Sequence, residues 1–221
     1  MNIEKITTAK HICIKTDNLS FPNASAFYTY CLTLHKKVSI ISIDKIDNKF
    51  FYLPWFDKVR EVVPSSADMS IDIKSNTSDL FDFFKMNQIK INTKMATSLY
   101  SSLLSEYKNF QTKEVDGIVF ALASELINLG AEHKLAYDCL TQRIGLNEFR
   151  LKAILFKNFI LTKDATNADI YISDVELKST GSIIDDVYPI LEVFLTLINV
   201  SEVRLLKSDE DNKLVMNIKE K

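Results

Sequence analysis

Residues 11–43, HICIKTDNLSFPNASAFYTYCLTLHKKVSIISI, decide the fold, because they read in order as a strand, a helix and a second strand. Residues 11–15 are rich in β-forming residues, residues 22–34 carry apolar side chains at helical spacing, and residues 37–43 form a second β run. A strand–helix–strand unit of this size predicts parallel strands joined by a right-handed crossover. Ligands of such sheets bind beyond the carboxyl ends of the strands, so the polar loop at 16–25 is the expected ligand-binding loop.

The next part of the chain contains an aromatic stretch, KFFYLPWF at 49–56. It is expected to be either a core or edge strand that ends at Pro54, or a surface patch for a partner. Residues 68–73 alternate like a strand, and residues 79–85 are expected to form a short helix.

From residue 93 the pattern becomes helical, and a mixed pattern follows after residue 160. Helices are expected over 93–107, 115–129, 135–143, 146–159 and 187–197, with Gly130 at a C-cap position after the second of them. Strands are expected over 169–173, 202–206 and 213–218, the last two joined by a turn at 208–212. The predicted fold is therefore α/β: an N-terminal parallel sheet flanked by helices over 1–145, a linker helix over 146–159 and a small C-terminal α/β domain over 160–221.

Composition narrows the classes of function. The chain of 221 residues has 47% hydrophobic and 25% charged residues, with a formal net charge of −2. This near-neutral balance gives no electrostatic surface for extended nucleic acid, although a few local cations would suffice for a small phosphorylated ligand. Cys13, Cys31 and Cys139 are isolated in the sequence, which argues against a disulfide framework or a thiolate metal site and favours the reducing cytoplasm.

No segment of the sequence predicts membrane insertion. The first 15 residues lack the apolar core of a secretory signal. The longest apolar run, at 187–200, contains Pro189 and Glu192 and is too short to span a bilayer.

Several stretches resemble the DHH phosphoesterase family, in its two-domain oligoribonuclease branch. The opening strand, the Pro-x-x-x-Ala loop and the helix leading to LHKKVSIIS (34–42) are similar to the first metal-binding motif and the strand after it. ATSLYSSLLSEYKNF (96–110), VFALASELINLGA (119–131) and GLNEFRLKAILFKNF (145–159) resemble the third-motif helix, the next helix and the interdomain linker. YISDVELKSTG (171–181) and the stretch at 202–221 resemble the substrate-side associated domain.

The resemblance implies a catalytic site whose metal ligands this chain has mostly replaced. Members hold two Mn²⁺ or Mg²⁺ ions with His and Asp side chains, and their first motif reads His-x-x-Pro-Asp-x-Asp. Aligned on Pro22, this chain has Leu19 for the histidine, Asn23 for the first aspartate and Ser25 for the second. The second-motif aspartate falls near Lys74, and the third-motif aspartate aligns with Glu106.

The Asp-His-His triplet of the family is absent from the sequence. The three histidines are isolated: His11 begins a predicted strand, His35 follows a predicted helix, and His133 is expected in the first turn of another. The glycine-rich loop that grips substrate phosphate in the family is expected after Lys221, where the chain stops, so the second domain is expected to be a truncated form of the associated domain.

The remaining groups are poor ligands for two metal ions. Two dications about 3.5–4 Å apart need several converging carboxylates and imidazoles, which neutral Asn and Ser side chains do not replace. Lys74 would oppose a metal ion; its ammonium either takes the place of a missing cation or is solvated after a strand. Asp17 and Asp72 lie near strand ends, and each is either a substitute ligand or a turn or cap residue.

The sequence thus predicts a catalytically inactive relative of the DHH phosphoesterases that needs no cofactor and acts as a binding, scaffold or regulatory protein. Its expected partner is another protein or a second copy, with Trp55 as the candidate contact residue. One alternative is a metal-dependent phosphoesterase on short oligoribonucleotides or small nucleotides, with Glu106 and Asp17 or Asp72 in a Mn²⁺ or Mg²⁺ site. A second alternative is a nucleotide-binding regulator whose cleft includes Asn23, Ser25 and Lys74.

Overall fold

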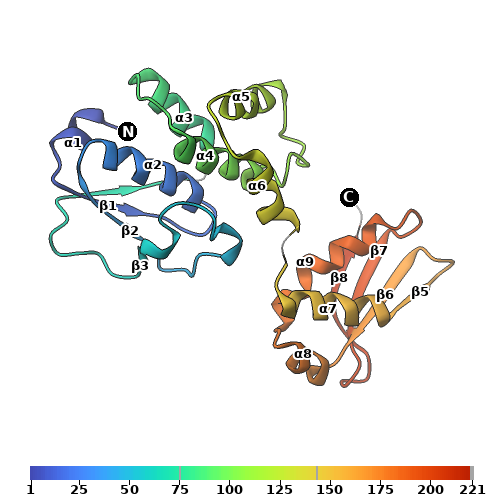
Figure 1. Ribbon diagram of the computed structural model, residues 1–221. Coiled ribbons are helices and arrows are strands. Elements are labelled where there is room, and N and C mark those ends of the chain that lie inside the picture. The colour runs from blue at the N-terminus through green and yellow to red at the C-terminus, as the bar shows by residue number, and fades with distance from the viewer. Residues whose placement is uncertain (75, 143, 220–221) are drawn as a thin grey trace. The chain divides into compact units, whose positions relative to one another are not determined.

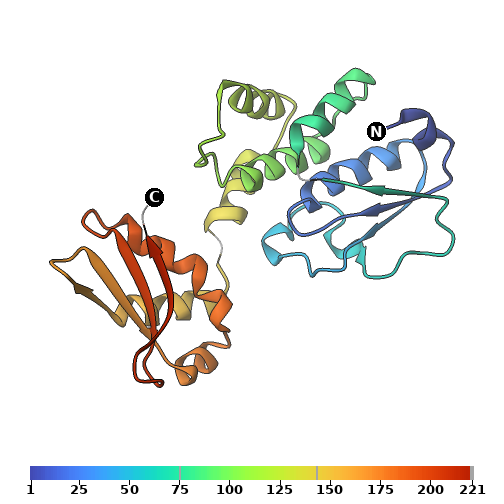
Figure 2. The ribbon, with the colours of Figure 1, turned by 180° about the vertical axis from the view of Figure 1, so that it is seen from behind.

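The computed structural model describes residues 1–74, 76–142 and 144–219, and the chain divides into two compact units (Figures 1 and 2). The N-terminal unit covers residues 1–143 and the C-terminal unit covers 144–221. Each unit has its own sheet and its own hydrophobic core. The predicted α/β class, with a parallel sheet flanked by helices and a small second sheet domain, is confirmed.

A parallel sheet in the order β3-β2-β1-β4 forms the centre of the N-terminal unit. Its strands are β1 (His11–Lys15), β2 (Lys37–Ile41), β3 (Val59–Arg60) and β4 (Met69–Asp72). Ile14 on β1 lies between Ile40 on β2 and Ile71 on β4 in the register of the sheet. The parallel pairing of β1 and β2 is the one that the strand–helix–strand pattern predicts.

Helices pack against this sheet and against one another. They are α1 (Ile3–Thr8), α2 (Phe21–Thr33), α3 (Thr77–Met86), α4 (Thr93–Glu106), α5 (Gly117–Asn128) and α6 (His133–Tyr137). The starts of four of them are set by capping side chains: Asn2, Asn76, Asn92 and Asp116 each accept a first-turn N–H of α1, α3, α4 or α5. α2 packs against α4 and is buried from Phe21 to Cys31, so its polar side chains need partners inside the unit.

The aromatic stretch at 49–56 is not a strand, and that prediction is wrong. It forms two short 3₁₀ turns, Asn48–Phe50 and Phe56–Lys58. Trp55 between them has a φ of 70°, a left-handed conformation that an extended strand does not contain. Phe50 and Leu53 are buried, and the ring centroid of Phe50 lies 6.0 Å from that of Phe21. The buried side chains of this stretch therefore belong to the core, and turns, not a strand, place them there.

The helix expected over 135–143 begins two residues earlier and changes its pitch. α6 ends at Tyr137, and Asp138–Gln142 continue as a π-helical turn. Arg143, its expected last residue, lies outside the described residues. Gly130 follows α5 with a φ of 92° and donates its N–H to the carbonyl of Ile127, as expected of a C-cap glycine.

The C-terminal unit is built on a mixed sheet in the order β5-β6-β7-β8. Its strands are β5 (Phe159–Thr162), β6 (Asn167–Ile172), β7 (Glu202–Lys207) and β8 (Lys213–Lys219). β6 and β7 are parallel and are joined through α8 (Asp174–Thr180) and α9 (Tyr188–Leu191), whereas both outer pairings are antiparallel. Leu151 and Leu155 of α7 (Leu146–Lys157) pack against this sheet, with Ile170 and Leu205 in the same core.

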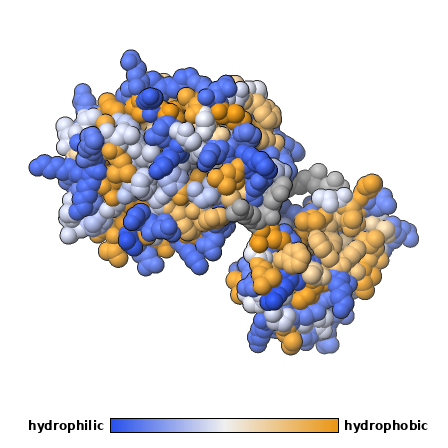
Figure 3. Space-filling model, in the orientation of Figure 1, coloured by the Kyte–Doolittle hydropathy of each residue, from blue (hydrophilic) through white to orange (hydrophobic). Residues whose placement is uncertain are grey.

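Two boundaries in this unit differ from the prediction. The helix expected over 146–159 ends at Lys157, and Phe159 begins β5, whose apolar residues continue the helical pattern in the sequence. The helix expected over 187–197 is a short α9 followed by a 3₁₀ segment, Glu192–Thr196. Hydrophobic side chains also reach the surface of this unit (Figure 3), and on α7 they include Phe149 and Phe156. In the described part of the chain, no helix has both the length and the apolar character needed to cross a membrane.

Candidate functional site

A cavity of about 370 Å³ lies where β1, β2 and β4 end. Lys15, Thr16 and Asp17 reach it from β1 and the loop after it, and Asp72, Ile73 and Lys74 reach it from β4 and its extension. Further lining residues are Ile41, Ile43, Glu61 and Val63. This is the edge at which parallel α/β sheets bind ligands. The structure thus brings together three of the residues predicted from the sequence: Asp17, Asp72 and Lys74.

The charges in this cavity are mostly free for a ligand. Lys15 and Asp72 are neighbours in the register of β1 and β4. Within the described ranges, neither Lys15 nor Lys74 forms an ion pair. Asp17 is used locally, because its Oδ1 accepts the backbone N–H of Ser20 at 2.8 Å just before α2 begins. Asp17 is therefore a turn residue, which is one of the two roles predicted for it.

Asn23 lies in the first turn of α2 and is fully buried. Its Nδ2 donates a hydrogen bond of 3.1 Å to the carbonyl oxygen of Lys74, which ties α2 to the end of β4. Its Oδ1 is buried without a hydrogen-bond partner among the described residues. An unpaired buried acceptor costs about 1–3 kcal/mol, so Asn23 is a destabilising residue unless a ligand or solvent molecule donates to this oxygen.

Ser25 does not line the cavity. It is fully buried, and its Oγ donates a hydrogen bond of 2.8 Å to the carbonyl oxygen of Pro54. The same Oγ lies 3.2 Å from the Oγ of Ser98 on α4. The side chain aligned with the second aspartate of the family motif is thus turned into the interior, between α2, α4 and the loop at Pro54.

Glu106 is the last residue of α4, and its carboxylate is bonded to α3. Its Oε2 accepts the backbone N–H of Thr77 at 3.2 Å and the hydroxyl of Thr77 at 2.9 Å. Thr77 is the first residue of α3, so the N–H that it contributes has no partner inside that helix. Glu106 is not among the residues that line the cavity.

The side chains present do not fit a two-metal centre. In the described parts of the chain, no three His, Cys, Asp or Glu side chains converge closely enough to hold a metal ion. Asn23 has one unpaired and uncharged oxygen, Ser25 is bonded in the interior, and Glu106 is bonded to Thr77. Leu19, aligned with the first-motif histidine, is an exposed apolar residue.

The histidines lie where the sequence places them, and each has surroundings of its own. His11 begins β1 and is buried, with Nδ1 2.9 Å from Ser66 Oγ and Nε2 2.9 Å from Ser39 Oγ. His35 follows α2 with a φ of 56°, and His133 is the first residue of α6. None of the three lines the cavity.

Trp55, the predicted contact residue, is half-buried and held inside the N-terminal unit. Its ring stacks on Tyr28 with the centroids 4.8 Å apart, and its Nε1 donates a hydrogen bond of 2.8 Å to Thr29 Oγ1. The Nζ of Lys94 lies 5.6 Å from the same ring. Trp55 thus contributes to packing, and its role in partner contact stays a prediction.

Thr16 belongs to the loop at 16–25, which the sequence predicts as the ligand-binding loop. Sequence reasoning missed the other lining residues of the cavity: Lys15, Ile41, Ile43, Glu61, Val63 and Ile73. The signal for Lys15 and Ile43 was present, because the two predicted strands, 11–15 and 37–43, end at these residues. No comparable signal exists for Glu61 and Val63, which follow the two-residue strand β3.

Comparison with known proteins gives a likeness in fold. No protein-family model matches the sequence, and no curated protein matches it. An exopolyphosphatase-related protein from Bacteroides fragilis superposes with a TM-score of 0.73 at 13% identity, over 95% of this chain and 79% of that one. A protein of Methanococcus jannaschii described as a family II inorganic pyrophosphatase gives a TM-score of 0.37 at 13% identity, over 89% of this chain and 83% of that one. The chain is therefore similar in fold to the exopolyphosphatase-related protein.

Proposed function

We propose that this chain is a non-catalytic binding protein built on the fold of a phosphoester-cleaving enzyme. One observation carries the proposal: the side chains at the expected metal-ligand positions are bonded within the fold. Asn23 donates to Lys74, Ser25 donates to Pro54, and Glu106 accepts from Thr77. Two adjacent dications need several free carboxylates or imidazoles, and these positions do not offer them.

The partner in this proposal is another protein or a second copy of the chain. Trp55 is the candidate contact residue in the N-terminal unit. Binding by the intact fold requires no metal ion, so the proposed activity is independent of Mn²⁺ and Mg²⁺.

A turnover assay tests the proposal against an active phosphoesterase. The full chain is incubated with bis-(p-nitrophenyl) phosphate and with short oligoribonucleotides, in the presence of Mn²⁺ or Mg²⁺. The expected result is that no more product is released than in a control with the metal ion and substrate but without the protein. Metal-dependent turnover that is abolished by Glu106→Gln, with Glu132→Gln as the matched surface control, contradicts the proposal and supports a remodelled site with Asp17 or Asp72.

The cavity itself favours a second candidate function, the binding of a small nucleotide. Its volume is in the range of small-molecule sites, about 300–1,000 Å³. Lys15 and Lys74 line it without ion pairs among the described residues, and the first turn of α2 begins next to its loop. A phosphate group bound there would be attracted by the two ammonium groups, although the carboxylates of Asp17, Glu61 and Asp72 lie in the same lining.

Hydrogen exchange on addition of adenosine monophosphate tests this second function. Binding in the cavity predicts slower exchange of the backbone amides at 16–25, in the unmodified chain and in Lys45→Ala. Lys45 is exposed and does not line the cavity, so it is the matched control for Lys74→Ala, in which the protection should be lost. Unchanged exchange in the unmodified chain rules this function out for the nucleotide used.

A further inference from the structure

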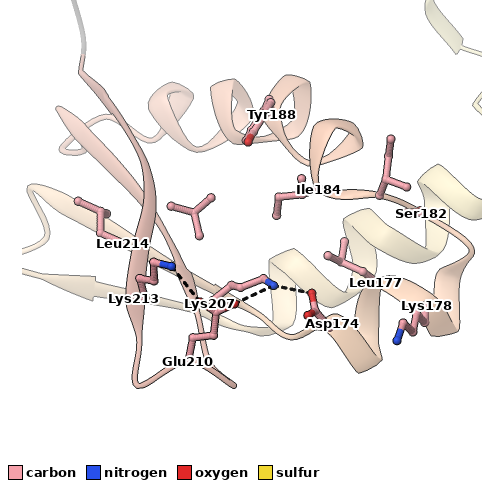
Figure 4. A pocket seen from close by; sticks show the side chains of 12 residues that line it. Asp174, Leu177, Lys178, Ser182, Ile184, Tyr188, Lys207, Glu210, Lys213 and Leu214 are labelled. Atoms are coloured by element: carbon pink, nitrogen blue, oxygen red, sulfur yellow. Dashed lines mark hydrogen bonds and ion pairs between the residues drawn. The ribbon is translucent and has the colours of Figure 1, made fainter.

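The C-terminal unit contains a larger cavity, of about 620 Å³, at the end of the sheet where β7 turns into β8 (Figure 4). Its walls come from the start of β8, from α8 and from the segment that leads into α9. Its apolar lining includes Leu177, Ile184, Tyr188, Leu214 and Val215. A hollow of this size with mostly apolar walls and a few polar groups is typical of a binding site.

Most charges around this cavity are already paired. Lys207 Nζ lies 2.6 Å from Asp174 Oδ1 and 3.2 Å from Glu210 Oε1, and Lys213 Nζ lies 3.1 Å from Glu210 Oε2. Figure 4 shows these ion pairs along one side, with Lys178 apart from them on α8. In the described chain Lys178 takes part in no ion pair. The charge still free to meet a ligand is therefore positive.

The strand beside this cavity has an open edge. β8 is the last strand in the order β5-β6-β7-β8, so only β7 pairs with it among the described strands. Leu214 is 52% exposed and Val215 is 37% exposed, and both line the cavity. The register of β7 and β8 shifts here: Leu205 faces Met216 and Leu206 faces Leu214. Val215 is thus the extra residue of a bulge.

A second copy of β8 is a poor occupant of this edge. The strand begins with Lys213 and ends with Lys219. Antiparallel pairing of two copies about a two-fold axis would set Lys213 of one copy against Lys219 of the other, and like charges opposite each other destabilise a strand pair. Lys213 is already paired with Glu210 and Lys219 lies 3.8 Å from Glu202, so among the described lining residues Lys178 is the lysine left to attract a carboxylate of a ligand.

We propose that β8 and the cavity beside it bind an extended, acidic segment of a partner protein. The segment adds a strand to the edge of β8, places an aliphatic side chain between Leu177 and Leu214, and sets an Asp or Glu against Lys178. Main-chain hydrogen bonds to an edge strand supply affinity, and a pocket beside the strand selects the side chain. This surface is independent of the N-terminal cavity, so it holds whether or not the chain cleaves phosphoesters.

Peptide selection on the full chain tests the proposal. A phage-displayed library of random peptides of about ten residues is selected for binding, and the enriched sequences are synthesised and measured by fluorescence anisotropy. The expected sequences combine an aliphatic residue with neighbouring Asp or Glu. Leu214→Asp and Lys178→Glu should each weaken binding by about tenfold or more, since each removes an anchor of the complex.

Ile198→Asp is the matched control, because Ile198 is also exposed in this unit and does not line the cavity. The affinity of Ile198→Asp for the selected peptides should stay within about twofold of that of the unmodified chain. Three results overturn the proposal: no enrichment over the unselected library, enriched peptides that bind Leu214→Asp as tightly as the unmodified chain, or a dimer in solution that Leu214→Asp dissociates. The last result would assign the edge to a second copy.

Discussion

The carboxylate of Glu106 and the first residue of α3, Thr77, are joined by two hydrogen bonds to a single oxygen. Oε2 accepts the backbone N–H at 3.2 Å and the hydroxyl at 2.9 Å. Thr77 is buried, so water does not replace Glu106 as the acceptor of that N–H. Glu106, the one carboxylate left at an expected metal-ligand position, thus connects the end of α4 to the start of α3.

Glu106→Ala should lower the free energy of unfolding by about 1–3 kcal/mol, because it leaves the buried N–H and hydroxyl of Thr77 unpaired. Glu106→Gln keeps an acceptor oxygen and should cost less. Urea unfolding followed by circular dichroism measures both, with Glu132→Ala as the surface control. Equal stability of Glu106→Ala and the unmodified chain would show that the Thr77 bonds contribute nothing.

Asp68 makes the stability of the N-terminal unit depend on pH. The backbone N–H of Lys10 and that of His11 each donate a bond of 2.9 Å to it, and they hold the pKa of Asp68 below its ordinary value of 3.8. Because the pKa is lower in the folded state, ionised Asp68 stabilises the fold. This contribution is fully present above pH 3.8 and is lost as the pH falls through the folded-state pKa. Asp68→Asn should therefore be less stable than the unmodified chain at pH 7, and the two should converge in acid.

Urea midpoints measured between neutral pH and about pH 3 check this prediction. A difference between Asp68→Asn and the unmodified chain that does not shrink toward acid would contradict it. Asp57→Asn is the control, because Asp57 is exposed and bonded to none of these groups.

The ion pair of Asp169 and Arg204 should stabilise the C-terminal unit. Asp169 is buried on β6, and its two oxygens accept Arg204 Nε at 2.6 Å and Nη2 at 2.5 Å from the adjacent strand β7. The hydrogen bond to Asp169 raises the pKa of Arg204. Asp169→Ala leaves the guanidinium unpaired and should cost about 2–3 kcal/mol, which is less than the roughly 3–5 kcal/mol of a fully buried broken pair because Arg204 is partly exposed.

Arg204→Lys tests the geometry of this pair, since lysine keeps the charge and cannot make both bonds. In thermal unfolding, the stability of Arg204→Lys should lie between that of the unmodified chain and that of Asp169→Ala. A lysine variant as stable as the unmodified chain would mean that only the charge matters.

Trp55, the single tryptophan, should report the unfolding of the N-terminal unit by fluorescence. Trp55→Ala removes the stacking on Tyr28 and the bond to Thr29, and it should cost about 2–3 kcal/mol. Trp55→Phe keeps an aromatic ring on Tyr28 and should cost about 1 kcal/mol. Guanidinium unfolding followed by circular dichroism measures both. A Trp55→Ala variant of unchanged stability would show that Trp55 does not contribute to packing, and it would favour the predicted contact of Trp55 with a partner.

The centre of the fold was predictable because its signals are local. Residues 11–15 and 37–43 are runs of β-forming residues and Pro22 suits the first turn of a helix, so the parallel unit follows from the sequence alone. The grouping of Asp17, Asp72 and Lys74 follows as well, because the carboxyl ends of parallel strands share one edge.

The direction of side chains on α2 was not predictable. Asn23 and Ser25 align with ligand positions, yet α2 is buried on all sides, and no polar stripe in its sequence says which side faces the cavity. Only the packing of α4 and the loop at Pro54 turns Ser25 inward. The left-handed φ of Trp55 and the break between α7 and β5 also depend on tertiary packing, since the apolar pattern continues through both places.

The most direct test of the central claim is calorimetric titration of the chelator-treated full chain with Mn²⁺. A non-catalytic binding protein whose expected ligand positions are bonded within the fold predicts no saturable binding at micromolar Mn²⁺. Stoichiometric micromolar binding that is lost in Asp17→Asn or Asp72→Asn would contradict the account, because it would show that the cavity holds a rebuilt metal site.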